Sequence, residues 1–449
     1  MIIALPTEVE YLLSKLKSSG YQAYIVGGCV RDYLLGKTPH DWDICTSALP
    51  AEVIAVFDNE KVIETGLEHG TVTVIINSTA YEITTFRTES DYSDNRRPDN
   101  VSFVTNVADD LARRDFTINA MAYNNEAGLV DLFGGRKDIC DKLIKTVGDS
   151  SKRFSEDALR ILRALRFSAN LGFNIDPATG NNIHSKKYLL NNISSERIWA
   201  EFKQLLMGEN VVKVLREYVD VISVFIPQIG KMVGFKQHSP YHCYDVWEHT
   251  LHALENAPND IIVRLAIVFH DIGKPETFFI DQEGTGHFHG HPKVSRKITE
   301  NVFNNLRVDN YTKNTVLTLV ENHDKIINPT EKSVKKTIQR LGSTELFEQL
   351  IALKKSDAWG QSLHLAIPRI NSLNTLLNIE RQLLEEKRLI LSVKELAVNG
   401  YDIISLGVTE GKQIGMVLDE LLSLVIDNNV QNRRKELLCA AKKIVSELN

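Results

Sequence analysis

"YIVGGCVRDYLLGKTPHDWDICTS", residues 24–47, decides how the first part of this chain folds. The apolar run before the glycines predicts a buried strand, and "DWDICT" predicts a second strand. Residues two positions apart in a strand project from the same face, so we expect Asp41 and Asp43 side by side, with Trp42 on the other face. Two carboxylates at this spacing suit Mg²⁺ ions about 3.5–4 Å apart, the arrangement of phosphoryl and nucleotidyl transfer.

The glycine pair and the arginine before these acids fit the same chemistry. Glycine lets the main chain approach a ligand closely, so the backbone N–H groups around Gly28 can face a phosphate. Arg31 can add a charge-assisted contact to that phosphate. A glycine turn followed by a solvated acidic edge is the simpler interpretation of each part alone. Their combination at this offset favours a nucleotide site.

Composition bounds the class of protein. The chain has 449 residues, 43% of them hydrophobic and 24% charged, which predicts two to four globular domains. The five cysteines are scattered without a CxxC pair, and no stretch near either end resembles a membrane span or a signal peptide. We therefore expect a cytoplasmic protein without a membrane partner. The net charge of −6 argues against a nonspecific nucleic-acid coat but allows local basic faces.

The expected secondary structure changes along the chain. Strand-like runs dominate 22–130, whereas helical periodicity dominates from about residue 155. The fold class expected is an α+β head followed by an almost entirely helical remainder. Within the head, "LARRDFTINAMAY" (111–123) predicts arginines before a helix of small residues. Arg114 can meet a phosphate or a ribose there, although a charge cluster at a helix start explains it equally well.

A charged stripe follows the head in "EDALRILRALRF" (156–167). Its charged residues recur every third position, which places them on one slowly drifting helix face; they are Asp157, Arg160, Arg163 and Arg166. A solvated arginine face explains the stripe by itself. Chemistry offers another use, because a carboxylate accepts from an exocyclic amino group while arginine donates to a ring nitrogen. Cytosine and adenine both present that pair of atoms, and guanine and uracil present the reverse.

Five segments, taken in order, resemble the motifs of class II tRNA nucleotidyltransferases, the CCA-adding enzymes related to bacterial poly(A) polymerases. They are "GGCVRDYLLGKTPHDWDICT", "RRDFTINAMAY", "LVDLFGGRKD", "EDALRILRALRFSANLGF" and "SSERIWAEF". The resemblance covers roughly residues 20–205. It implies a polymerase-beta-like head followed by a helical neck, body and tail, and template-independent addition of CCA to tRNA from CTP and ATP with release of pyrophosphate.

The resemblance also implies a role for each candidate residue of the head. It makes Asp41 and Asp43 the Mg²⁺ ligands. The residues that it implies for nucleotide binding are Gly28, Arg31 and Arg114, with Asp157 and Arg160 as a protein template that Arg163 and Arg166 support. It makes 85–101, with Arg87, the flexible loop that helps to switch specificity from C to A. Enzymes that add only CC lack this loop, whereas A-adding enzymes keep it.

Nine of the 13 histidines fall between His238 and His323. The adjacent pair His270–Asp271 follows an apolar helix, and imidazole with carboxylate suits a divalent transition metal. The order of His249, this pair and the distant Asp357 resembles the HD-domain phosphohydrolases. His291 and His323 are candidates for a second metal or for phosphate. The alternative is a set of packing and surface histidines. In related CCA-adding enzymes, an HD domain resembles a metal-dependent phosphatase or phosphodiesterase acting on 2′,3′-cyclic phosphate or on 3′ ends that need repair.

These observations predict four parts: a nucleotidyltransferase head (1–140), a neck and body (141–235), an HD domain (236–365) and a helical tail (366–449). The partners expected are tRNA, CTP and ATP, without DNA. Three alternatives remain open. One is an A-adding enzyme or a poly(A) polymerase, although the mixed charge of the C-terminal "RRKELLCAAKKIVSELN" disfavours the polymerase. Another is an HD phosphohydrolase whose head only binds nucleotide. The last is an RNA-binding protein with a degenerate head, which the intact acid pair disfavours.

Overall fold

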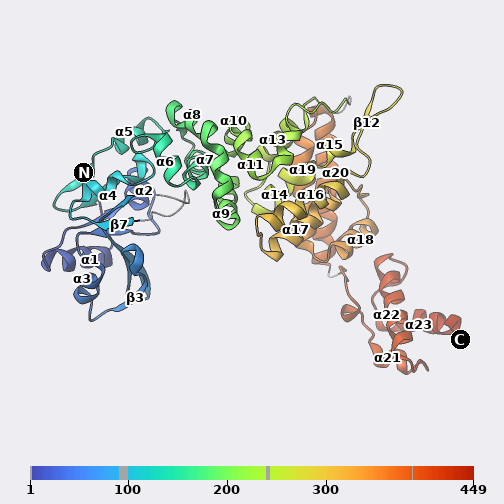
Figure 1. The fold of residues 1–449 in the computed structure, drawn as a ribbon. Helices are drawn as coiled ribbons and strands as arrows, with labels where there is room; N and C mark the ends of the chain where they lie inside the picture. Colours follow the sequence, from blue (N-terminus) through green and yellow to red (C-terminus); the bar gives the residue numbers. More distant parts are fainter. Residues whose placement is uncertain (1–2, 91–99, 239–242, 387, 449) are drawn as a thin grey trace. The chain divides into compact units, whose positions relative to one another are not determined.

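The computed structural model describes residues 3–90, 100–238, 243–386 and 388–448 (Figure 1). The chain forms two compact units, Met1–Pro227 and Gln228–Asn449. The first unit contains a mixed α/β head and helices, and the second is almost entirely helical. The predicted fold class, an α+β head followed by helical parts, is confirmed.

A seven-stranded sheet forms the centre of the head, in the order β3-β4-β5-β2-β1-β8-β9. Neighbouring strands are antiparallel except β2 and β5, which are parallel. The central strand β1 is buried over all four residues, as its apolar sequence "AYIV" predicts. The strands are β1 Ala23–Val26, β2 Ile44–Thr46, β3 Lys61–Gly66, β4 Thr71–Ile76, β5 Thr79–Thr85, β8 Met121–Asn124 and β9 Gly128–Asp131.

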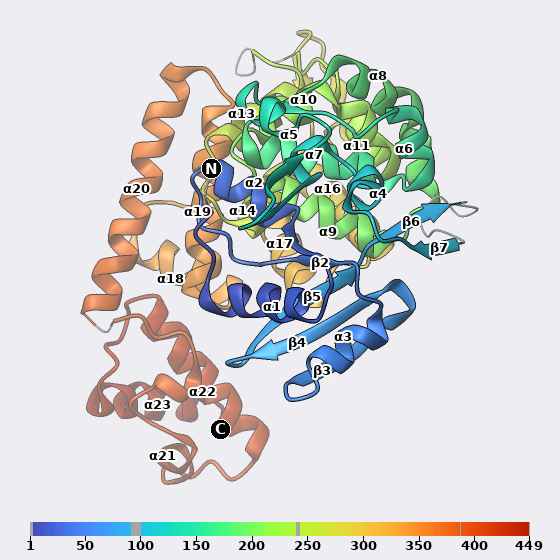
Figure 2. The same ribbon diagram turned by 90° about the vertical axis from the view of Figure 1, so that its left-hand side faces the viewer.

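Short helices cover this sheet. Helix α1 (Thr7–Ser18) buries Val9, Leu12, Leu13 and Leu16, the spacing of one helix face. It contacts β1 and also α3 (Pro50–Val56), which lies against β4 and β5 (Figure 2). Helix α2 (Gly28–Leu34) follows β1 directly and packs on β1 and β8. The start of α2 is therefore fixed by the most deeply buried strands of the head.

Two local predictions for the head are wrong. The small-residue segment after Arg114 forms a single 3-10 turn, Thr117–Asn119, followed by strand β8 and not by a helix. Strand β8 pairs with β1 on one side and β9 on the other, and its first three residues are buried. Tertiary packing outweighs the helix propensity of "NAMA" there. The segment "GLVDLFGGRKDI" (128–139) predicts a hairpin with a Gly-Gly turn. No such turn forms, because Gly134 adopts a left-handed conformation that starts α5 (Gly135–Cys140).

Helices complete the first unit. Helix α7 is amphipathic and packs mainly against α9. The remaining elements are α4 Val107–Ala112, α6 Ser150–Glu156, α7 Leu159–Leu171, α8 Pro177–Lys186, α9 Ser195–Leu206, α10 Val211–Glu217 and α11 Val219–Phe225, with the small strand pairs β6 Arg87–Ser90 with β7 Asn100–Phe103 and β10 Leu143–Ile144 with β11 Asn174–Ile175.

The second unit surrounds one buried helix. Helix α14 is apolar on nearly all sides and contacts α13, α16, α17 and α19, so its C-terminal end lies inside the helical packing. The helices are α12 Pro227–Met232, α13 Val246–Glu255, α14 Ile261–His270, α15 Lys274–Thr277, α16 His291–Asn305, α17 Asn310–Asn322, α18 Glu331–Leu341, α19 Thr344–Trp359 and α20 Leu363–Glu385; a small hairpin joins β12 Phe279–Ile280 to β13 Gly286–His287. The expected boundary between the HD domain and the tail, at 365/366, falls inside α20.

The last part of the chain has its own hydrophobic core. Helices α21 (Gly400–Ile404), α22 (Gly411–Ile426) and α23 (Arg434–Leu448) bury Ile403, Val417 and Leu437 completely. Among the helices that the structure describes, none combines the length and hydropathy needed to cross a membrane.

Candidate active sites

The acid pair lies at the edge of the central sheet. Strand β2 begins at Ile44, so Asp41 and Asp43 occupy the segment leading into it and not the strand itself. The backbone N–H of Val26 donates to the Asp43 carbonyl at 3.0 Å, which ties this segment to the end of β1. Both acid side chains are exposed, whereas Trp42 is half-buried and lines a cavity with Tyr33. The alternation expected from the sequence therefore holds.

A third carboxylate belongs to this edge. Parallel pairing of Ile44 with Ile83 places Glu82, on β5, alongside Asp43. Partial burial raises the pKa of Asp43; the Glu82 and Asp41 carboxylates raise it further, while the Arg114 guanidinium opposes them. This excess of negative charge is what a divalent cation would offset.

The turn after β1 brings a guanidinium close to the backbone. Gly27 has a positive φ of 81°, and a Cβ there would lie 3.0 Å from Arg114 Nη1. Gly28, the glycine singled out by the sequence, begins α2, where a Cβ would make only ordinary contact, 3.7 Å from Arg31 Nη2. The position that strictly requires glycine is thus Gly27.

A buried aspartate organises the arginines of the head. Asp110 is fully buried and accepts hydrogen bonds from Arg113 Nη2 at 2.7 Å and Arg114 Nη2 at 3.3 Å. Burial alone would raise the pKa of Asp110, but the two arginines bring it below its usual value. For Arg114, burial favours the neutral form, yet Asp110 and Asp43 are among the groups that raise its pKa. Arg114 is therefore held as a cation beside the acid pair.

Arg87, which the sequence placed in a loop, lies on strand β6. It donates to Glu89 at 3.0 Å and to the carbonyl of His69, and Glu89 also pairs with Arg113. The central part of the predicted flexible loop, 91–99, lies outside the described residues.

The predicted template pair meets at the start of α7. Asp157 is the residue between α6 and α7; its Oδ1 accepts from the Leu159 N–H at 3.1 Å and its Oδ2 pairs with Arg197 at 3.0 Å. Arg160 is buried and donates to Glu156 at 2.6 Å and, through Nη2, to the carbonyl of Arg113 at 3.2 Å. That last bond joins the template pair to the residue preceding Arg114.

The other arginines converge on one ring. Phe167 is buried, and the guanidinium carbons of Arg31, Arg163 and Arg166 lie 5.2, 5.4 and 4.3 Å from its centroid. Arg163 pairs with Asp115 at 2.7 Å, the residue after Arg114. Arg166 pairs with Glu201 of α9 at 2.6 Å, and Arg31 donates to Asn119 at 2.7 Å. The charged stripe thus faces the head and is not a solvated helix face.

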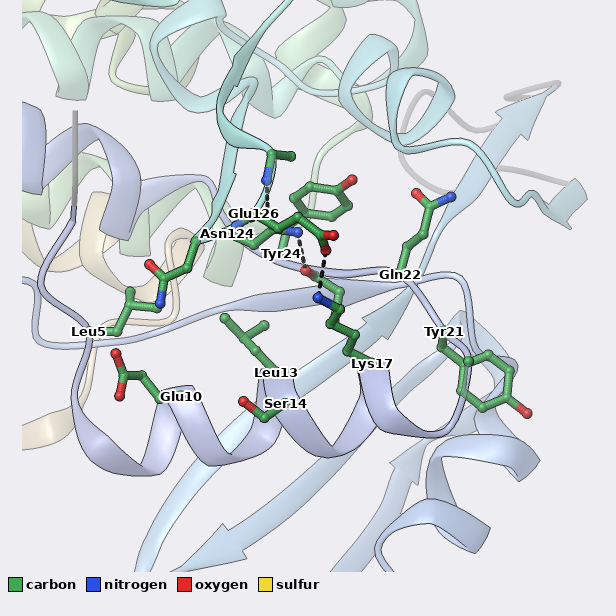
Figure 3. A pocket seen from close by; sticks show the side chains of 14 residues that line it. Leu5, Glu10, Leu13, Ser14, Lys17, Tyr21, Gln22, Tyr24, Asn124 and Glu126 are labelled. Carbon is green, nitrogen blue, oxygen red and sulfur yellow. Dashed lines mark hydrogen bonds and ion pairs between the residues drawn. The ribbon is translucent and has the colours of Figure 1, made fainter.

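The head also contains a cavity of about 560 Å³, drawn in Figure 3. Helix α1, the start of β1 and the β8–β9 turn line it, and the Lys17–Glu126 ion pair of 2.8 Å crosses it. Ala23 and Tyr24 belong to the end of β1 remote from Gly27, because Ala23 pairs with Thr46 while Val26 bonds to Asp43. This cavity is therefore separate from the acid pair.

The six predicted HD residues converge in the second unit. Asp271 lies at their centre: its Oδ2 is 3.5 Å from His249 Nε2 and 3.2 Å from His270 Nε2, and its Oδ1 is 3.3 Å from His291 Nε2 and 3.7 Å from His323 Nε2. Asp357 Oδ1 completes the first group, 2.9 Å from His249. The donor atoms form two buried triads that share Asp271. Each triad offers three ligand atoms to a metal ion.

The tautomers implied by the hydrogen bonds fit metal binding. In all four histidines Nδ1 faces a backbone carbonyl, at 2.9 Å for His249, 2.6 Å for His270, 2.9 Å for His291 and 2.7 Å for His323. A ring that donates from Nδ1 presents a lone pair at Nε2, and metal-binding histidines are typically oriented in this way. His291 Nε2 and His323 Nε2 are only 3.1 Å apart. Two such lone pairs repel unless a cation stands between them.

The surroundings of the cluster support the same conclusion. Burial lowers the pKa of His270, but Asp271 and Asp357 raise it to about 10, so the site demands positive charge. A Cβ on Gly360 would lie 2.4 Å from His249 Nδ1, so only glycine leaves that ring in place. A cavity of about 300 Å³ adjoins the cluster.

Two cations also line this cavity. Lys274 Nζ is 2.7 Å from Asp271 Oδ2, and Arg369 Nη2 is 2.8 Å from Asp357 Oδ2. Arg369 belongs to α20, which the sequence assigned mostly to the tail.

Sequence reasoning missed four contributors to these sites. Glu82 and Arg369 carried no motif and became visible only through strand register and helix packing. Asp110 had a usable signal, because it precedes Arg113 and Arg114 at i+3 and i+4 spacing. Gly27 was present in the quoted glycine pair, but only its φ distinguishes it from Gly28.

The head and the buried cluster together define a nucleotidyltransferase that carries an HD domain. Three family models match in that order: "Poly A polymerase head domain" over residues 23–145, "Probable RNA and SrmB- binding site of polymerase A" over 172–228, and "HD domain" over 241–358. The head and the His/Asp cluster each indicate a metal cofactor.

Relatives extend this assignment over the full length. The CCA-adding enzyme of Limosilactobacillus fermentum is 34% identical, covering 99% of both chains, and that of Pediococcus pentosaceus is 34% identical, covering 98% of this chain and 99% of its own. A crystal structure of the Bacillus stearothermophilus CCA-adding enzyme in complex with CTP has a TM-score of 0.73 at 29% identity, covering 98% of this chain and 97% of its own. The chain belongs to the CCA-adding enzymes, as its motifs predicted.

Proposed function

We propose that the acid pair and the template pair act on one bound nucleotide while this enzyme adds CCA to the tRNA 3′ end from CTP and ATP. The observation that carries the proposal is the hydrogen bond of Arg160 to the Arg113 carbonyl. It brings the start of α7 against the segment whose next residue, Arg114, interacts electrostatically with Asp43. The partners follow from the relatives, one of which was solved with CTP and another, from Thermotoga maritima, with tRNA.

In this proposal the acids at the sheet edge hold Mg²⁺. Asp41 and Asp43 are the ligands, and Glu82 adds negative charge beside them. Mg²⁺ bound there would lower the pKa of the RNA 3′-hydroxyl and balance the charge that develops on the leaving pyrophosphate. The 3′-oxygen attacks the α-phosphorus, and the bond from that phosphorus to the pyrophosphate oxygen breaks. Arg31, Arg114 and the backbone at Gly28 hold the phosphates in line for this attack.

Base selection requires the template pair to exchange partners. Asp157 now pairs with Arg197, and Arg160 with Glu156. A cytosine or adenine offers Asp157 an amino group and Arg160 a ring nitrogen, so both keep a charged hydrogen bond. Uracil or guanine presents an acceptor to the Asp157 carboxylate and a donor to the Arg160 guanidinium. Neither side chain can then form its hydrogen bond, which costs the full desolvation of unpaired polar groups. Arg163 and Arg166 support this helix face through their pairs with Asp115 and Glu201.

The test uses tRNA that ends before CCA, incubated with each nucleoside triphosphate separately and then with CTP and ATP together. We expect incorporation of CTP, then of ATP, and a stop after three residues. An open-ended A tail would identify a poly(A) polymerase, and incorporation of ATP only onto tRNA that already ends in CC would identify an A-adding enzyme. Activity that persists in the Asp41→Ala, Asp43→Ala double variant would leave the head as a nucleotide-binding module only.

We further propose that the HD cluster is a metal-dependent phosphohydrolase. The six residues would hold two divalent transition metals, and Asp271 is common to both triads. Metal bound there would supply an activated water and a Lewis acid for phosphate-ester hydrolysis. Lys274 and Arg369 are placed to bind a phosphate group. The test is release of phosphate from phosphomonoesters and cyclic phosphates by metal-stripped protein reloaded with Mn²⁺, Co²⁺, Ni²⁺ or Zn²⁺; hydrolysis with none of them would refute the proposal.

We assign a separate role to each of the four expected parts. We propose catalysis in the head (1–140), nucleotide selection and tRNA binding in the neck and body (141–235), hydrolysis in the HD domain (236–365) and further tRNA contacts in the tail (366–449). Recognition of tRNA would rest on its backbone and shape. Because tRNA, CTP and ATP are cytoplasmic, we place the reaction in the cytoplasm.

A further inference from the structure

A cavity of about 560 Å³ lies where helix α18 meets the tail in the second unit. Lys335 of α18 lines one side, and residues of the tail line the rest. Among the described residues that line this cavity, three are cations, three are carboxamides, three are apolar and none is acidic. None of them belongs to the acid pair, the template pair or the HD cluster. The cavity is therefore a separate site with an excess of positive charge.

Opposite charges join α18 to the tail around this cavity. Lys332 and Lys336 pair with Asp427 at 3.3 and 2.7 Å. Arg388 donates to both carboxylate oxygens of Glu331, at 2.6 and 3.1 Å. Each of these charges thus has an opposite charge as its partner.

Lys335 differs from its neighbours on α18. It is only 3% exposed, and its ammonium donates to Asn428 Oδ1 at 2.6 Å. Among the residues that the structure describes, no carboxylate forms an ion pair with this ammonium. Burial and the Arg388 guanidinium lower the pKa of Lys335, against the weaker influence of Glu331. A charge is costly to bury unless an opposite charge accompanies it, so Lys335 indicates that an anion binds beside it.

The other cations and the size of the cavity indicate what kind of anion fits. Arg433 also lines the cavity; its side chain is 73% exposed and lies 3.8 Å from Glu436, so its guanidinium is available to a ligand. Arg388 is engaged with Glu331 and adds positive potential. Lysine and arginine together suit phosphate, which has several acceptor oxygens and up to two negative charges.

The cavity selects a small ligand. Its volume is in the range of small-molecule sites, and Ile390, Val425 and Val430 form an apolar wall that can contact a carbon moiety. A phosphate within an RNA backbone carries a ribose on each side and does not reach an ammonium as deeply buried as that of Lys335. A free or terminal phosphate does.

We propose that the cavity between α18 and the tail binds a small phosphate-bearing anion, with Lys335 and Arg433 as its ligands. The site is independent of both proposed catalytic functions. Because Lys335 belongs to α18 and Arg433 to the tail, the bound anion joins these two parts of the second unit.

The experiment is equilibrium dialysis of radiolabelled inorganic phosphate against full-length wild-type protein and three variants. Lys335→Met removes the buried charge but keeps an unbranched side chain, and Arg433→Gln changes an exposed ligand that is not needed for folding. The matched control is Lys336→Met, the next residue of the same helix, whose side chain is 50% exposed, pairs with Asp427 and does not line the cavity. Phosphate bound at the two active sites is common to all four proteins and cancels in the comparison.

We expect phosphate binding at one site per chain to weaken by about tenfold or more in Lys335→Met and by about threefold in Arg433→Gln, and to be unchanged in Lys336→Met. Chemical denaturation checks the fold, and if Lys335→Met does not fold, Arg433→Gln decides. Equal phosphate binding by all four proteins would overturn the proposal. An equal loss in Lys336→Met would also overturn it, because general surface charge would then explain the binding.

A second arm tests whether RNA occupies the cavity instead. The affinity for tRNA lacking CCA is measured over a range of salt concentrations for wild type and Lys335→Met. A small anion predicts the same slope of log K against log salt for both proteins. A slope shallower by about one in Lys335→Met would show that an RNA phosphate is bound there and would overturn the assignment to a small anion.

Discussion

The two sites of this enzyme differ in how much of each exists before a ligand arrives. In the head, Asp41 and Asp43 are exposed, and the template residues Asp157 and Arg160 are engaged with Arg197 and Glu156. In the HD domain, every expected ligand is buried and already oriented by a backbone carbonyl or a charged neighbour. In the proposed mechanism the template pair exchanges partners for each nucleotide, whereas the expected ligands of the HD cluster already lie together. An enzyme that accepts two different bases benefits from the first arrangement, and tight metal binding benefits from the second.

The largest effect is expected from removing the acid pair of the head, which should leave the HD domain unaffected. Asp41→Asn with Asp43→Asn should lower single-turnover CTP incorporation into tRNA lacking CCA by about 10³-fold or more, because several kcal/mol of metal-mediated charge stabilisation is lost. Phosphate release by the HD domain should not change and serves as the internal control. Parallel loss of both activities would contradict the separation.

The reciprocal change should affect only the second unit. Asp271→Asn removes the charge shared by both triads, so we expect loss of HD hydrolysis and of bound divalent metal, measured by elemental analysis after dialysis. His323→Ala belongs to one triad only and should lose part of the metal. CTP incorporation should stay at the wild-type rate in both variants. Retention of full metal content by Asp271→Asn would show that the cluster is not the metal site.

A matched glycine pair tests how closely the head is built around Arg114. Gly27→Ala forces an L-residue to a φ of 81° and places a Cβ 3.0 Å from Arg114 Nη1. We expect a loss of about 1–3 kcal/mol in unfolding free energy and roughly tenfold weaker use of CTP. Gly28→Ala introduces only an ordinary contact and should leave the unfolding free energy nearly unchanged, as measured by chemical denaturation. Equal effects at both positions would contradict this geometry.

The smallest expected effect concerns Glu380, a buried acid outside both sites. Glu380 of α20 is fully buried, neither carboxylate oxygen has a hydrogen-bond partner among the described residues, and burial with nearby Glu348 raises its pKa to about 7. Because the folded pKa lies above the unfolded value, ionisation costs stability progressively from about pH 4.5 to 7. Glu380→Gln should therefore stabilise the protein by about 1–3 kcal/mol at pH 8 and much less at pH 4.

Denaturation at the two pH values checks this prediction. The control is Glu385→Gln, at an exposed position of the same helix, which should change stability little at either pH. A larger gain for Glu380→Gln at pH 4 than at pH 8 would reverse the predicted sign. Asp357, buried beside Arg369 and His249, illustrates the contrast, because its partners hold its pKa well below the usual range despite burial.

The sequence predicted most of what depends on local pattern. The α+β head, the helical remainder and the convergence of six HD residues followed from spacing or resemblance, whereas the strand expected at Asp41 and Asp43 begins only at Ile44. The strand β8 could not be predicted, because its small residues gain their extended conformation from pairing with β1 and β9.

Site residues that join a site only through tertiary contacts could not be predicted from the sequence either. Glu82 joins the acid pair through the parallel register of β2 and β5, and Arg369 reaches Asp357 from a helix that the sequence assigned to the tail.

The central claim is that one nucleotide lies between the acid pair and the template pair. Its most direct test is the ratio of CTP to UTP incorporation in single turnovers on tRNA lacking CCA, compared between wild type and Asp157→Asn. The amide can donate as well as accept, so the ratio should fall by about 10–100-fold, chiefly because UTP is used better. An unchanged ratio would show that the base is read elsewhere and would contradict the account.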